Sequence, residues 1–136
     1  MRTVVVVVAM AVALAGCGGG KDFANKPRPP VTLQLTGVIT KEKVTISPRK
    51  VGAGPVVIKV SNQSGGTRTL LLEGNGIQER VGPISSLAVG TLQKTLKPGR
   101  YTVKAGSEAA TAHAIRAATL LIGKERGSAS DKVLLP

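Results

Sequence analysis

Apolar and polar residues alternate along most of the chain from Val31 onward. In the segment 55–62, Val56, Ile58 and Val60 share one face, and Lys59 lies on the other. Such alternation is typical of β-strands with one buried face, and glycine, proline or asparagine marks most of the turns. About eight strands are predicted, at 31–35, 38–46, 55–62, 67–73, 77–81, 87–96, 100–105 and 118–122. This density of short strands favours an all-β sandwich or barrel.

Three segments lack this alternation. Residues 18–30 are rich in glycine and proline and are expected to form a flexible-to-stiff spacer. Residues 108–117 are rich in alanine, a strong helix former, and are expected to form either a short helix or a long loop. Residues 124–136 have the composition of a mobile C-terminal tail.

The start of the chain has a different pattern. Met1-Arg2-Thr3 is followed by an unbroken apolar run from Val4 to Ala15. This run is too short for a membrane-spanning helix, which needs about 20 residues. A short basic start followed by such a run is typical of a secretory signal peptide.

The four residues that end this run, Leu14-Ala15-Gly16-Cys17, resemble the lipobox of bacterial lipoproteins. The resemblance implies that the Cys17 thiol receives a diacylglyceryl group and that the chain is cut just before it. We therefore expect a signal peptide at 1–16, a lipidated tether at 17–30, a domain at 31–123 and a tail at 124–136. The protein is expected to be anchored on the extracytoplasmic face of the cell membrane.

The composition excludes several kinds of active site. The chain has one His and one Cys, too few for a multi-ligand His/Cys metal site or a disulfide within one molecule. Of the acidic residues, Glu73 and Glu79 flank a Gly-Asn-Gly turn and are interpreted as solvated strand-end charges rather than a catalytic pair. Ser85 and Ser86 occupy a turn. No enzyme activity, catalytic residue or cofactor is expected.

The charge is the remaining broad clue. The net charge of +12 falls to +11 when the predicted cleavage removes Arg2. Either the surface is simply basic and solvated, or it attracts anionic lipids, anionic envelope polymers or an acidic envelope protein. Nucleic acid is not an expected partner, because the protein is exported and has few aromatic residues for stacking. Tyr101 is expected to pack in the core and to hold the turn at Pro98-Gly99.

Three segments of the expected domain, in order, resemble parts of a cupredoxin. Residues 45–74 resemble the proline turn, the strand ending in asparagine and the strand after it. Residues 96–103, LKPGRYTV, resemble the hairpin that leads to the copper loop, and 118–123 resemble the closing strand. The resemblance covers about 31–123 and implies a Greek-key β-sandwich of two sheets.

Blue-copper cupredoxins bind the metal through two His, one Cys and a weak axial Met. The resemblance places Arg68 at the first His and Ala105 at the Cys. The loop 106–117 would supply the second His and the Met; it holds His113 and no Met, and either His113 or Arg116 takes the place of the Met. The ligand set is therefore absent, and no metal site is expected.

His113 has two interpretations, as a weak metal ligand with Glu108 or as an ordinary surface residue, and the second is favoured. The sequence thus predicts a membrane-anchored lipoprotein carrying a copper-free, cupredoxin-like binding or structural module. The alternatives are a copper-binding or electron-transfer protein and an electrostatic binder of anionic envelope polymers or lipids.

Overall fold

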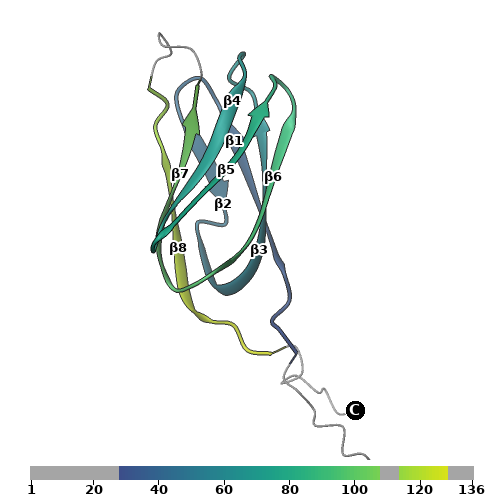
Figure 1. The fold of residues 1–136 in the computed structure, drawn as a ribbon, viewed down its shortest axis with the longest axis vertical. Coiled ribbons are helices and arrows are strands. Elements are labelled where there is room, and N and C mark those ends of the chain that lie inside the picture. Colours follow the sequence, from purple (N-terminus) through teal and green to yellow (C-terminus); the bar gives the residue numbers. More distant parts are fainter. Residues whose placement is uncertain (1–27, 108–113, 129–136) are drawn as a thin grey trace, which may run out of the picture.

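The computed structural model describes residues 28–107 and 114–128, which form eight β-strands and no helix (Figure 1). Consequently none of these residues forms a helix able to span a membrane. The strands are β1 (Leu33–Ile39), β2 (Val44–Ser47), β3 (Lys50–Asn62), β4 (Arg68–Gly74), β5 (Ile77–Ile84), β6 (Val89–Leu96), β7 (Gly99–Gly106) and β8 (Ala118–Glu125).

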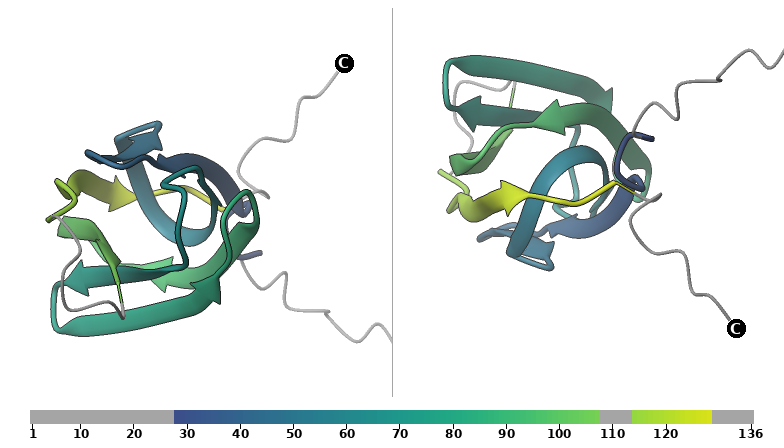
Figure 2. Two further views of the ribbon diagram at one scale, coloured as in Figure 1. Left: turned by 90° about the horizontal axis from the view of Figure 1, so that it is seen from above. Right: turned by 90° about the horizontal axis from the view of Figure 1, so that it is seen from below.

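The strands form two layers that face each other (Figure 2). One layer, the β1 sheet, has the order β2-β1-β3-β6, with β1 and β3 parallel and the other pairs antiparallel. The other layer, the β7 sheet, has the order β3-β8-β7-β4-β5, with β3 and β8 parallel. Strand β3 belongs to both layers and therefore connects them.

The core lies between the layers and follows the alternation of the sequence. Val56, Ile58 and Val60 are all fully buried, as the pattern predicted. Tyr101 and Val103 of β7 are buried opposite them. Each such aliphatic side chain contributes about 1.5–3 kcal/mol when it leaves water, so the core is the main source of stability.

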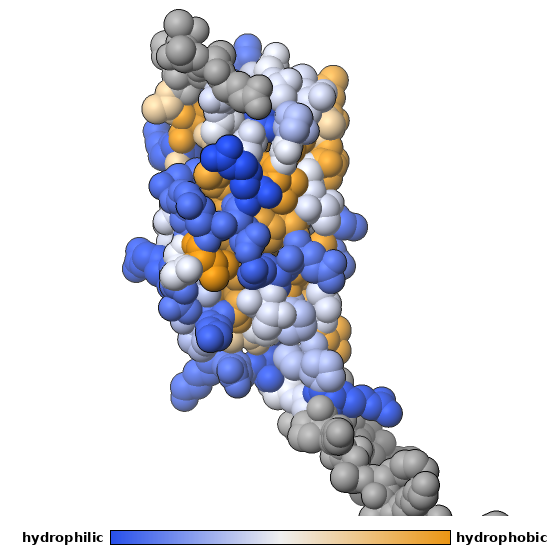
Figure 3. All heavy atoms as spheres, viewed as in Figure 1, coloured by the Kyte–Doolittle hydropathy of each residue, from blue (hydrophilic) through white to orange (hydrophobic). Residues whose placement is uncertain are grey.

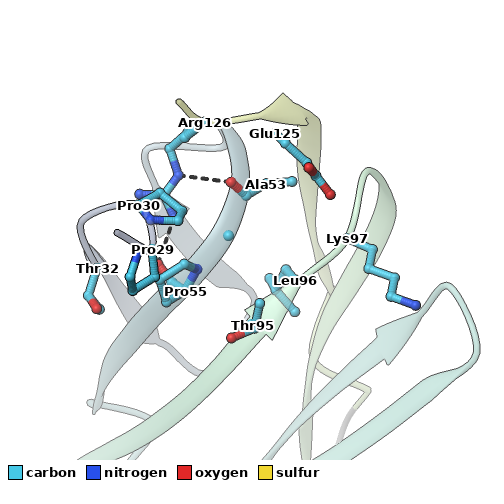
Figure 4. Close-up of a pocket in the computed structure, with 11 residues that line it drawn as sticks. Pro29, Pro30, Thr32, Ala53, Pro55, Thr95, Leu96, Lys97, Glu125 and Arg126 are labelled. Carbon is cyan, nitrogen blue, oxygen red and sulfur yellow. Dashed lines mark hydrogen bonds between the residues drawn. The ribbon is translucent and has the colours of Figure 1, made fainter. Parts of the chain in front are cut away.

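Strand β3 changes from one sheet to the other at Gly54, whose φ of 130° is unfavourable for residues with a side chain. The Arg126 side chain lies inside this bend (Figure 4). Its Nε donates to the carbonyl oxygens of Gly52 and Ala53 at 3.2 and 3.0 Å, and its Nη2 donates to that of Pro55 at 2.7 Å. A Cβ at Gly54 would lie 2.7 Å from the guanidinium, so the glycine makes room for the arginine.

The strand ends differ from the sequence prediction in several places. Strands were predicted at 31–35 and 38–46, but β1 runs unbroken from Leu33 to Ile39 and β2 is separate, at Val44–Ser47. Strand β3 begins five residues before Pro55, because the glycines there allow a bend rather than end the strand. Strand β5 continues through Pro83 to Ile84, which an edge strand tolerates because its outer N–H groups need no partner. Strand β8 extends beyond Ile122 to Glu125.

The segment 108–117 was predicted as a short helix or a loop. Residues 114–117 are not helical, because Arg116 forms a parallel bridge with Lys43. Residues 108–113 lie outside the described part of the chain.

Replacing Arg126 with Met should lower the free energy of unfolding by about 2 kcal/mol, because the carbonyl groups of the bend lose a charged donor. Arg100→Met is the matched control, since Arg100 is exposed on β7, and should change stability by less than about 0.5 kcal/mol. Urea unfolding followed by circular dichroism measures both. Equal losses in the two variants would show that Arg126 does not hold the bend.

Candidate functional site

The C-terminal end of β3 is held in place by hydrogen bonds of the Asn62 side chain, which is fully buried. Its Nδ2 donates to the carbonyl oxygens of Gly66 at 2.7 Å and Ile84 at 2.8 Å. Its Oδ1 accepts hydrogen bonds from the backbone N–H of Ser64 at 3.1 Å and from the Ser64 hydroxyl at 2.8 Å. A buried amide is tolerated only when it is bonded in this way. Asn62 therefore joins β3, the loop after it and the end of β5.

The backbone of Asn62 is bonded as well. Its N–H donates to the carbonyl of Ala88 at 2.9 Å, and its carbonyl accepts from the N–H of Leu87 at 2.7 Å. The turn between β5 and β6 is thus fixed against β3. We call this region, residues 62–68 with residues 84–88, the Asn62 end of the sandwich.

Arg68 begins β4 at the Asn62 end, at the position of the first copper-ligating His in the cupredoxin resemblance. Its Nε donates to the Ser64 hydroxyl at 2.8 Å. Ser64 is buried, and its hydroxyl in turn donates a hydrogen bond to Asn62 Oδ1. A guanidinium stays protonated in proteins and has no lone pair available for a metal. Arg68 therefore extends the hydrogen-bond network and does not supply a ligand.

Ala105, at the position of the Cys ligand, lies on β7 opposite Leu70 of β4. Its methyl group is partly buried and packs against the apolar core. It offers no donor atom to a metal. Arg116, one of the two candidates for the Met position, is exposed beside β8, and His113 lies outside the described residues.

A copper ion of the blue-copper kind does not fit this set of residues. The sequence has a single His and a single Cys, and Cys17 is far from the domain in the chain. Within residues 28–107 and 114–128, no three His, Cys, Asp or Glu side chains lie together as metal ligands would. A blue-copper centre needs two imidazoles, and the sequence has one.

The two glutamates that flank the β4–β5 turn pair with different lysines. Glu73 binds Lys104 and accepts a hydrogen bond from Gln78 at 3.1 Å. The hydrogen bond from Lys104, followed by that from Gln78, holds the pKa of Glu73 below its usual value. Glu79 binds Lys94 of β6 instead. Each carboxylate is thus engaged with a lysine, as expected for structural charges.

Tyr101 has the structural role that the sequence predicted. Its ring is buried, and its hydroxyl donates to the carbonyl of Lys97 at 2.9 Å. Asn75 Nδ2 donates to the carbonyl of Pro98 at 3.3 Å and so helps to hold the same turn. Such a tyrosine at a strand corner is a recurring feature of Greek-key sandwiches.

A cavity of about 550 Å³ lies beside the Gly54 bend, and Figure 4 shows residues that line it. Its walls include Pro29, Pro30, Pro55 and Leu96. Arg126, also at its edge, is already bonded to backbone carbonyls. The cavity adjoins the start of the domain and shows no group of side chains suited to catalysis.

The sequence predicts strands at 55–62 and 67–73 and thus a loop between them, but it does not reveal the hydrogen bonds of Asn62 and Ser64. The available signal was an asparagine at the end of a strand of β-branched residues. Cys17 lies outside the described residues, so its lipidation remains a prediction.

No protein-family model matches the chain, and no curated protein is similar to it in sequence. A solved multicopper oxidase structure is similar over 74% of this chain and 44% of its own, with 11% identity and a TM-score of 0.50. A Cu-containing nitrite reductase from Thermus scotoductus SA-01 is similar over 71% of this chain and 28% of its own (14% identity, TM-score 0.47). Auracyanin A, a "blue" copper protein from Chloroflexus aurantiacus, is similar over 69% of this chain and 99% of its own (13% identity, TM-score 0.44).

The chain thus spans less than half of the first two of these proteins. At such low identity, the likeness to the multicopper oxidase concerns the fold alone. The sequence resemblance, the strand order and this likeness agree: the chain folds as an all-β, cupredoxin-like sandwich.

Proposed function

We propose that this protein is a lipid-anchored lipoprotein whose cupredoxin-like domain is a copper-free binding module on the extracytoplasmic face of the membrane. The observation that carries the proposal is at the Asn62 end. There Arg68, which the cupredoxin resemblance places at the first His position, is bonded to the Ser64 hydroxyl.

The anchor follows from the lipobox resemblance at Leu14–Cys17. A diacylglyceryl group together with an acylated amino terminus gives a stable anchor, whereas one chain gives only marginal binding. The tether 18–30 reaches at most about 45 Å when extended. The domain would therefore work close to the lipid surface.

The copper-free role rests on the available donor atoms. Processing at Cys17 removes both methionines and converts the one thiol into a thioether bearing the lipid. A single imidazole remains, at His113. Electron transfer through a blue-copper centre needs a thiolate and two imidazoles on the metal.

A binding role is favoured over catalysis by what the polar side chains do. Asn62, Ser64 and Arg126 bond to the protein itself. Glu73 and Glu79 are paired with lysines. The excess of positive charge in the sequence is available to a partner.

Copper titration of the full chain, purified in detergent and stripped with a chelator, tests the copper-free role. We expect no stoichiometric binding of Cu(I) or Cu(II) and no blue absorption, because the thiolate is missing. His113→Ala is the matched variant, and it should remove any weak, non-blue binding by the lone imidazole. A saturable blue band in the wild-type protein would overturn the proposal.

Metabolic labelling with radioactive palmitate tests the anchor. Cys17→Ser should abolish the label and move the protein out of the membrane fraction, because the acylated sulfur is lost. Gly18→Ser makes a similar change one residue later and should keep both the label and the membrane location. Persistent labelling of Cys17→Ser would show that the lipobox prediction is wrong.

A further inference from the structure

A second cavity, of about 350 Å³, lies where β2 and β8 come together. Three basic residues line it, Lys43, Arg49 and Arg116, together with the two hydroxyl residues Thr45 and Thr119. The rest of its lining is valine and alanine. We call this cavity the seam cavity.

The seam cavity exists because the pairing along β8 is interrupted. At one end, Arg116 bridges to Lys43, and its carbonyl accepts from the N–H of Val44 at 2.8 Å. At the other end, pairing with β3 resumes at Leu121, whose N–H donates to the carbonyl of Arg49 at 2.8 Å. The β8 residues between these two points have no strand partner on the side of β2. The seam cavity is therefore the gap between the Lys43–Arg116 bridge and the start of the β3–β8 pairing.

The same hydrogen bonds hold the backbones of the three basic residues. Arg116 is bonded through both its N–H, to Glu42 at 2.9 Å, and its carbonyl. Lys43 accepts from the N–H of Thr40 at 2.9 Å. The three cations come from three separate segments, so the fold rather than the local sequence brings them to one cavity.

No acidic residue lines the seam cavity, and none of its three basic side chains forms an ion pair within the described part of the chain. Lys94 and Lys104, by contrast, are each neutralised by a glutamate. Glu42 is next to Lys43 in sequence, but it does not line the cavity. Like charges lining one cavity repel one another, and a bound anion would remove that repulsion.

The surroundings are also cationic. The register places Lys50, Arg80, Arg100 and Lys104 on the outer face of the β7 sheet, together with the acidic residue Glu73. The outer face of the β1 sheet has a single charged residue among its paired positions, Lys59. Figure 3 shows the β7 side, where hydrophilic side chains lie between hydrophobic ones.

We propose that the seam cavity binds a phosphate group. Arginine guanidinium groups form paired hydrogen bonds with phosphate oxygens, and lysine and threonine add a point charge and hydroxyl donors. Three positive charges suit a group that carries up to two negative charges at neutral pH. The inference deepens the proposed binding role. Phosphate binding itself does not depend on the absence of copper or on the anchor, whereas the preference for a lipid source rests on the proposed anchor.

The same phosphate chemistry has two sources outside the membrane: free inorganic phosphate and the headgroup of an anionic phospholipid. The tether favours the second source, because it keeps the domain near a lipid surface where basic residues are attracted to anionic lipids. The experiment has one arm for each source.

The first arm is calorimetric titration of full-chain Cys17→Ser, which has no lipid of its own, with inorganic phosphate in a low-salt buffer. We expect saturable binding of one phosphate. Arg49→Gln and Arg116→Gln should each weaken it about tenfold, since each removes a charged hydrogen-bond donor. Lys59→Gln removes the same charge from the other sheet and should leave the affinity unchanged.

The second arm is sedimentation of the same proteins with vesicles of phosphatidylglycerol, and of phosphatidylcholine as the neutral control. Binding to the anionic vesicles that Arg49→Gln and Arg116→Gln weaken, but Lys59→Gln does not, identifies the lipid headgroup as the source. Phosphate binding without vesicle binding identifies free phosphate.

The proposal is overturned if neither arm gives saturable binding, or if Lys59→Gln weakens binding as much as the cavity variants do. The second result would show general electrostatic attraction without a site. Urea unfolding of each variant confirms that it is folded, and Arg49→Lys, which keeps the charge but loses the guanidinium, should weaken binding less than Arg49→Gln. A copper titration of the same protein tests the copper-free role independently.

Discussion

The buried amide of Asn62 is the interaction on which one end of this sandwich depends. It bonds to the loop after β3 and to the end of β5, so hydrogen bonds of one side chain join the two sheets there. Removing a group of this kind leaves several buried backbone groups without partners, and each costs about 1–3 kcal/mol. Arg68 belongs to the same network, because its Nε donates to the Ser64 hydroxyl, which donates to the Asn62 amide.

At the opposite end of the sandwich, the side chain of Arg126 likewise bonds to backbone groups. Arg126 reaches into the bend of β3 and bonds to backbone carbonyls that the change of sheet leaves available. Between the two ends, the apolar faces of both sheets close on each other. One polar side chain at each end therefore helps to fix how the layers meet.

Much of this fold was predictable from alternation, because a strand with one buried face shows its period directly in the sequence. The prediction was wrong where contacts between residues distant in sequence determine the local structure. Gly52 and Gly54 resemble strand breakers, yet they make room for Arg126, which is distant in sequence. The copper-free interpretation rests on residue types and on the cupredoxin resemblance, and it stays a prediction. The seam cavity was not predictable, because Arg49 and Arg116 come together only through the pairing of β3 with β8.

The central claim is that the chain's own side chains, with Asn62 foremost, hold the end of the sandwich at which the cupredoxin resemblance places copper. Equilibrium unfolding in urea with a chelator, comparing the wild type with Asn62→Ala and Gln63→Ala, tests this most directly. The account predicts a stable wild type, a loss of about 3 kcal/mol for Asn62→Ala and almost none for the exposed Gln63. Equal small losses in both variants, or a wild type that becomes stable only when copper is added, would contradict it.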